Sequence, residues 1–192
     1  MPYAKPDALV STAWLADHLD APDVRVVDAS WFFPQEGRDP RAEHAKLRIP
    51  GAVFFDIDEI ADTTSHLPHM LPAPEKFSSR VRRLGLGDGV KIVVYDAIGL
   101  RSAARAWWMF RVFGHDDVAV LDGGLPKWLA EGRPVVEERP EPPRERHFTA
   151  RVNNLLVKDR HQVARATGDG RTQLVDTRPA DRFRGEAPEP RP

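Results

Sequence analysis

The chain has 192 residues, of which 41% are hydrophobic and 30% are charged, with a formal net charge of −1. Its mixed charges exclude a broad basic face for nucleic acid, and its apolar runs are too short to span a membrane. It contains no cysteine, which excludes disulfides, thiolate metal sites and a thiol nucleophile among these residues. Its first residues lack the pattern of a secretory signal. We therefore expect a soluble, cytoplasmic protein without nucleic-acid or membrane partners.

Apolar spacing and turn residues predict helices that alternate with strands along most of the chain. In chain order, the predicted elements are a helix capped by Ser11, a strand over 24–27, a helix over 41–47, a strand over 52–55, a helix over 74–84, a strand over 91–95, a helix over 103–113, a strand over 118–121 and a helix over 125–131. The run 91–95 is apolar almost throughout, which is typical of parallel strands covered on both faces. The pattern predicts a doubly wound, mostly parallel α/β domain over residues 1–136.

A second pattern begins after a break rich in proline and charge. Residues 137–150 predict an extended linker because the stretch has little to bury. A predicted helix over 158–166 and a predicted strand over 173–175 then repeat the order seen at the start of the chain. Asp176 ends the second strand as Asp28 ends the first, 148 residues earlier (176 − 28). Residues 151–192 therefore read as the start of a second domain copy, too short to close a core alone.

In open parallel sheets, ligands bind beyond the carboxyl ends of the strands. Here that place includes Asp96 and the loop that leads into the helix at 103. A thiol at such a bend would be activated by the helix amino terminus, whereas an aspartate cannot act as a thiolate nucleophile. We expect this loop to be structural or to serve an interface.

Several motifs resemble the first domain of tandem rhodanese-type sulfurtransferases, nearest to the 3-mercaptopyruvate branch. They are RIPGAVFFDID at 48–58, LPHMLP at 67–72, AWWMF at 106–110 and LDGG at 121–124. Residues 176–191 resemble the opening of the second, catalytic domain of that family. The resemblance implies a rhodanese-like α/β fold over nearly the whole chain.

The resemblance also implies a function. In that family, a cysteine of the second domain takes sulfur from 3-mercaptopyruvate or thiosulfate and passes it to a thiol, such as that of thioredoxin, or to cyanide, without a further cofactor. We expect this chain to stop before the cysteine loop and to be inactive alone. Thiosulfate as the donor is one alternative. Another is a non-enzymatic rhodanese-like module that binds a partner, or forms oligomers, through an exposed interdomain face.

By position in the motifs, Asp58 and His69 match a family aspartate and histidine that relay protons together with a serine of the catalytic loop. An aspartate can orient a histidine that moves protons near neutral pH. The alternative is that Asp58 caps the following helix and that His69 is a hydrogen-bonded loop residue. Asp62 and His66 lie in the same segment, but the irregular spacing of these residues predicts no metal site.

Arg182 and Arg191 match the two arginines with which the mercaptopyruvate branch holds the carboxylate and the keto group of its substrate. Guanidinium groups suit a carboxylate because two parallel donors fit two oxygen atoms. The alternative is a solvated basic run, since arginine is frequent in this part of the chain.

Overall fold

The computed structural model describes residues 6–138 and 143–188. The chain divides into a first unit that ends at Asn153 and a second unit that begins at Asn154. The two units are described separately below. The predicted boundaries at 136 and 150 stay predictions. No helix within the described ranges combines the length and apolar character that crossing a bilayer requires.

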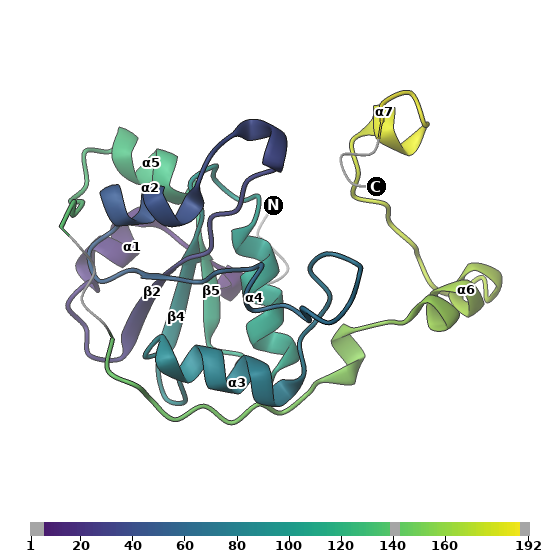
Figure 1. The fold of residues 1–192 in the computed structure, drawn as a ribbon, viewed down its shortest axis with the longest axis horizontal. Coiled ribbons are helices and arrows are strands. Elements are labelled where there is room, and N and C mark those ends of the chain that lie inside the picture. Colours follow the sequence, from purple (N-terminus) through teal and green to yellow (C-terminus); the bar gives the residue numbers. More distant parts are fainter. Residues whose placement is uncertain (1–5, 139–142, 189–192) are drawn as a thin grey trace. The chain divides into compact units, whose positions relative to one another are not determined.

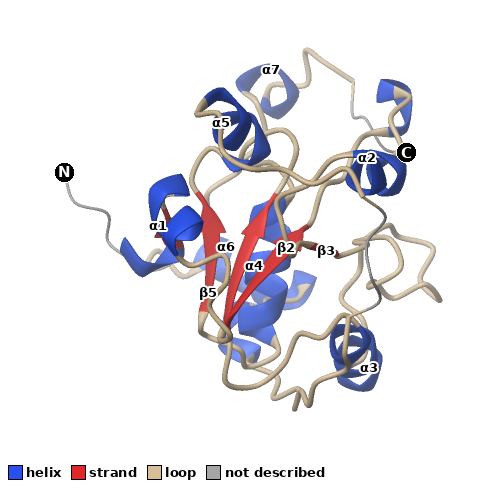
Figure 2. Ribbon diagram, turned by 90° about the vertical axis from the view of Figure 1, so that its left-hand side faces the viewer, coloured by secondary structure: helices blue, strands red, loops and turns tan. Residues whose placement is uncertain are grey.

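A sheet of five parallel strands forms the centre of the first unit. The strands are β1 (Leu9–Val10), β2 (Val24–Asp28), β3 (Val53–Phe54), β4 (Lys91–Tyr95) and β5 (Val118–Leu121), in the spatial order β1-β5-β4-β2-β3. In Figure 2 the arrows of β2 and β5 point the same way, as parallel pairing requires. The predicted parallel α/β architecture is confirmed.

Helices cover both faces of this sheet, as Figure 1 shows. They are α1 (Thr12–Asp17), α2 (Pro40–Lys46), α3 (Pro74–Arg83), α4 (Ala103–Val112) and α5 (Gly124–Ala130), with short 3-10 turns at η1 (Pro6–Ala8) and η2 (Pro34–Glu36). Ser11 caps α1 as predicted, because its side chain accepts the N–H of Trp14. The predicted helices therefore form within about one residue of their expected bounds.

Alternation along the strands sends side chains to two separate cores. Val27 and Val94 pack with Phe77 of α3 and Phe110 of α4 on one face. On the other face, Val26, Val93 and Tyr95 of the sheet pack with Leu15 of α1 and Trp128 of α5. The sheet is buried on both sides, and this explains the nearly unbroken apolar run of β4.

The last residues of the first unit pack against the rest of that unit. We call residues 143–153 the strap. Phe148 is only 3% exposed and meets Phe77 edge-on, with 5.6 Å between ring centroids. The hydroxyl of Ser78 donates to the Phe148 carbonyl at 2.7 Å, and the Arg151 N–H donates to the Phe113 carbonyl at 2.9 Å. The strap thus completes the core beside α3 (Figure 1).

The second unit has helices but no sheet among its described residues. It contains η3 (Asn154–Leu156), α6 (Arg160–Gly168) and α7 (Ala180–Phe183), so the predicted helix at 158–166 is confirmed as α6. The predicted strand over 173–175 does not form, because no described strand lies beside it to accept its hydrogen bonds. No described residue of this unit is buried, and Val175 is 81% exposed.

Candidate functional site

Three loops at the carboxyl ends of β2, β3 and β4 meet around Trp31. The backbone N–H of Trp31 donates to the Ser102 hydroxyl at 3.2 Å, and the Arg101 guanidinium donates to the Trp31 carbonyl at 2.9 Å. The Trp31 indole donates to Asp58 at 3.0 Å. Trp31 therefore joins segments that lie far apart in the sequence at the edge of the sheet where parallel α/β proteins bind ligands.

Asp58 and His69 form the central pair of this site. The Nε2 atom of His69 lies 2.5 Å from one carboxylate oxygen of Asp58, and the other oxygen accepts the indole N–H of Trp31. The Trp31 ring meets the imidazole edge-on at 4.9 Å between centroids. The Asp58 side chain is 66% exposed, whereas that of His69 is 14% exposed. The carboxylate orients the imidazole and leaves its Nδ1 atom for a second proton partner.

The loop that carries His69 is fastened to α3 and α4. His69 has a φ of 58°, in the left-handed region that few non-glycine residues occupy. Its carbonyl accepts a hydrogen bond from Arg105 of α4. The Asp62 N–H donates to the Met70 carbonyl at 2.9 Å, and Lys76 of α3 donates to the Ala61 carbonyl at 2.6 Å. The loop that carries His69 is thus held by contacts to its main chain, and these contacts do not depend on the imidazole ring.

The structure assigns the capping role in this segment to Asp56. Its carboxylate accepts the N–H groups of Asp58 and Glu59, both at 3.1 Å. The carboxylate of Asp58 is turned instead to Trp31 and His69. The alternative expectation that Asp58 caps a following helix is therefore wrong, because residues 57–60 form a turn whose amides at positions 58 and 59 are bonded by Asp56.

A buried polar cluster supports the loop after β2. Asp28 accepts hydrogen bonds from the Ser30 hydroxyl at 2.5 Å and from Tyr95 at 3.3 Å, and it contacts His44 at 2.9 Å. Burial raises the pKa of the Tyr95 hydroxyl, and the Asp28 charge raises it further. Ser30 also accepts the N–H of Ala97 at 2.9 Å, which ties this loop to the loop after β4. The hydrogen bonds of Asp28 and Ser30 therefore fix the loop that carries Trp31.

Asp96 occupies the point on which the loop after β4 converges. One of its oxygens accepts the N–H groups of Ile98 and Gly99, and the other accepts those of three further residues, Arg101, Ser102 and Ala103. The residue is fully buried. In this chain, the backbone amides that would stabilise a thiolate at this bend donate their hydrogen bonds to the carboxylate of Asp96 instead.

An ion pair braces the rim of the site. Arg101 donates to the Glu36 carboxylate through its two terminal guanidinium nitrogens, at 2.7 and 2.8 Å. This hydrogen bonding lowers the pKa of Glu36, and Glu36 in turn raises the pKa of Arg101. Arg101 and Trp31 were not among the predicted site residues. Their only signal in the sequence is that each lies a few residues after an aspartate at the end of a strand or directly after it.

The two predicted substrate arginines belong to the second unit. Arg182 lies on α7 in the second unit, and Arg191 lies outside the described residues. Within the described ranges, no group of three or more His, Asp and Glu side chains is arranged to hold a metal ion. The site as described consists of Asp58, His69 and the residues that position them.

Several known proteins are similar to this chain. A model of the rhodanese-like domain matches residues 11–131. The human 3-mercaptopyruvate sulfurtransferase is 45% identical over 191 residues, which cover 96% of this chain and 64% of that protein. The rat thiosulfate sulfurtransferase is 47% identical, with 95% of this chain and 63% of that protein covered. The chain thus spans less than two thirds of the length of these curated relatives.

A similar structure is also known. The crystal structure of SseA from Escherichia coli, a 3-mercaptopyruvate sulfotransferase, matches with a TM-score of 0.87 and 42% identity. The match covers 93% of this chain and 68% of SseA.

Proposed function

This chain belongs to the family of rhodanese-like domains, and on that premise we propose that it takes part in sulfur transfer from 3-mercaptopyruvate to a thiol, such as that of thioredoxin, or to cyanide. The sulfur would be carried as a persulfide on a cysteine outside these 192 residues, since they contain none. A cytoplasmic location belongs to the same proposal. The observation that carries the proposal is the Asp58–His69 pair at the carboxyl edge of the sheet.

The pair would serve proton transfer in this reaction. The cysteine thiolate attacks the sulfur of 3-mercaptopyruvate, the carbon–sulfur bond breaks, and the enolate of pyruvate leaves and takes up a proton. The acceptor thiolate or cyanide then attacks the outer sulfur of the persulfide and restores the cysteine. Asp58 orients His69, and His69 passes a proton through a serine beside that cysteine.

Arg182 and Arg191 would bind the substrate. Their guanidinium groups suit the carboxylate and the keto oxygen of 3-mercaptopyruvate, because planar paired donors fit such acceptors. Thiosulfate is the alternative donor, and the similarity to the rat thiosulfate sulfurtransferase supports it. Relative turnover of the two donors distinguishes these branches.

Two assays test the proposal. The purified 192-residue chain should release no pyruvate from 3-mercaptopyruvate with a thiol acceptor, because no thiolate is present to attack. Turnover by this chain would overturn the assignment of the chemistry to an absent cysteine. The Escherichia coli 3-mercaptopyruvate sulfurtransferase serves as the positive control.

The second assay joins this chain to the cysteine-bearing domain of that relative. In the fused protein, His69→Gln should lower kcat about 100-fold or more, because the proton relay is lost. His66→Gln is the matched control, since His66 is exposed in the same loop. Equal activity of the two variants would remove His69 from the mechanism.

We also propose a second function, as a module that binds further copies of itself. Four exposed apolar side chains lie in the loops that follow β3 and β4. Leu67 and Met70 flank His69 in sequence, Ile98 and Leu100 follow β4, and all four are 40–50% exposed. Such a surface favours self-association. Light scattering that shows a monomer at high concentration would contradict this function.

A further inference from the structure

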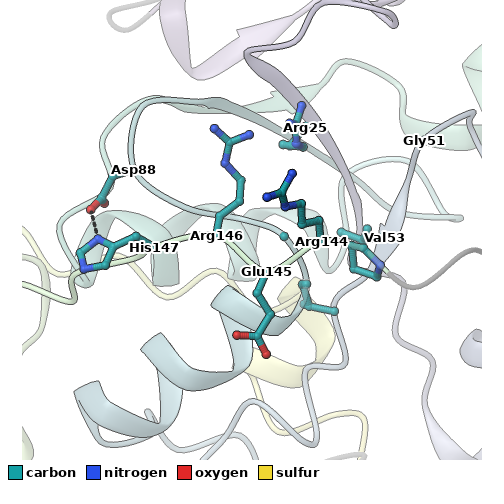
Figure 3. Close-up of a pocket in the computed structure, with 11 residues that line it drawn as sticks. Arg25, Gly51, Val53, Asp88, Arg144, Glu145, Arg146 and His147 are labelled. Atoms are coloured by element: carbon teal, nitrogen blue, oxygen red, sulfur yellow. Dashed lines mark hydrogen bonds and ion pairs between the residues drawn. The ribbon is translucent and has the colours of Figure 1, made fainter.

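A pocket of about 760 Å³ lies at the amino-terminal edge of the sheet, away from Asp58 and His69. It is bounded by β2, by residues that precede β3 and β4, and by the strap. Arg25 of β2 and Arg144 and Arg146 of the strap line it. Figure 3 shows their three guanidinium groups directed to the same side of the strap, whereas the Glu145 carboxylate points the other way.

The arginines of this pocket are not paired with the carboxylates that line it, because Asp88 contacts His147 at 3.2 Å and Glu145 points the other way. The Arg25 guanidinium donates to the Val24 carbonyl at 2.6 Å, and none of the three arginines forms an ion pair within the described ranges. Burial lowers the pKa of Arg25, the Arg146 charge lowers it further, and Asp23 offsets part of this effect. Like charges held together in this way are relieved when an anion binds.

The arginines of the strap are held in place by its backbone. A Cβ atom at Gly85 would lie 2.9 Å from the Arg144 carbonyl, and one at Gly87 would lie 2.2 Å from the His147 carbonyl. The Asp88 N–H donates to the His147 carbonyl at 2.9 Å. The strap therefore lies directly on the glycines that follow α3. A site with a fixed backbone loses little conformational entropy when a ligand binds.

We propose that this pocket binds a small polyanion that carries two or more phosphate or sulfate groups. Guanidinium groups bind tetrahedral oxyanions through paired N–H donors, and three of them match more than one anionic group. The volume exceeds the needs of a single phosphate. Among the described residues that line the pocket there is no Trp, Tyr or Phe on which a nucleobase could stack. This site is independent of sulfur transfer.

Calorimetric titration of the 192-residue chain with tripolyphosphate at constant ionic strength tests the proposal. We expect saturable binding at one site. Arg25→Gln and Arg146→Gln should each raise the Kd about tenfold, because each removes a charged hydrogen-bond donor. Arg151→Gln is the control, since it removes the same charge from an exposed residue outside the pocket.

Three outcomes would overturn the proposal. These are the absence of saturable binding, equal weakening by Arg151→Gln, and inorganic phosphate or sulfate binding as tightly as tripolyphosphate. The pocket variants should remain folded because they relieve repulsion, and circular dichroism checks this. As a second measurement, tripolyphosphate should raise the unfolding temperature of the unchanged chain and of Arg151→Gln, but not that of the Arg25→Gln/Arg146→Gln double variant.

Discussion

The two units of this chain differ in how far their apolar side chains are buried. In the first unit, Phe110 and Trp128 are fully buried between helices and a parallel sheet. In the second unit, Leu155 and Val175 are more than 80% exposed, although α6 begins with a capping box at Asp159. Local signals are enough to start a helix, whereas a strand needs a neighbouring strand and a core needs two layers. The second unit has a smaller share of hydrophobic residues than the first, and no strand lies beside residues 173–175 in the part of the chain that the structure describes.

The largest expected effect comes from introducing a thiol, which the chain lacks, into the first unit. Asp96→Cys would place a thiol where backbone amides converge, and they should lower its pKa. With thiosulfate, the thiolate would attack the sulfane sulfur, release sulfite and gain one sulfur atom, which mass spectrometry detects. Cyanide should then remove that sulfur as thiocyanate. A folded variant that gains no sulfur would show that the loop of the first unit cannot support persulfide chemistry.

Removing an apolar side chain should lower the free energy of unfolding by several kcal/mol more in the first unit than in the second. Phe77 contacts Phe110, Phe113 and Phe148 in the first unit, so Phe77→Ala should lower the free energy of unfolding by about 3–5 kcal/mol. Val175→Ala should change it by less than about 0.5 kcal/mol, because that side chain is already exposed. Urea unfolding measures both values. A comparable loss for Val175→Ala would show that the second unit has a core.

Alanine substitutions at one glycine of each unit test how closely the backbone is packed there. Gly87→Ala would drive a methyl group into the His147 carbonyl and should cost about 1–3 kcal/mol, because the strap must shift. Gly168 ends α6 with no atom within 4 Å of the corresponding position, so Gly168→Ala should not destabilise the protein. Thermal unfolding distinguishes them. Equal unfolding temperatures would mean that the strap does not pack as described.

The smallest expected effect concerns acid stability. Arg101 lowers the pKa of Glu36 below its usual 4.5, so this pair stabilises the folded state above that pH and loses its effect as the pH falls through the lowered value. Glu36→Gln should therefore destabilise the first unit at pH 7 and have no effect at the lowest pH. Glu186 also has a lowered pKa, because of Arg184, but Glu186→Gln should leave cooperative unfolding unchanged. A similar acid dependence of both variants would contradict the division into units.

Strong local patterns were sufficient to predict most of the first unit. The apolar run of β4 and the spacing of Phe77 and Val81 in α3 gave elements close to the observed bounds. Asp58 and His69 were found by their motifs, and the structure brings them within hydrogen-bonding distance. Such features depend on neighbours in the sequence or on positions next to strand ends.

Features that depend on distant partners were missed. β1 has only two residues, too few to show alternation, and exists because β5 offers it an edge. Phe148 stands among charged and proline residues, so nothing in its surroundings predicts a core position. The grouping of Arg25 with Arg144 and Arg146 depends on the path of the strap. Conversely, residues 173–175 have the pattern of a strand but have no partner strand within residues 6–138 and 143–188.

The pairing of β1 with β5, together with the burial of Phe148, has a consequence for biosynthesis. β1 is synthesised first but cannot pair until β5, the last strand of the sheet, has been made. The aromatic core is complete only later, when the strap has left the ribosome. Nascent chains that end between these points would expose one sheet edge and several phenylalanines. We therefore expect the growing polypeptide to depend on chaperones until the strap is in place.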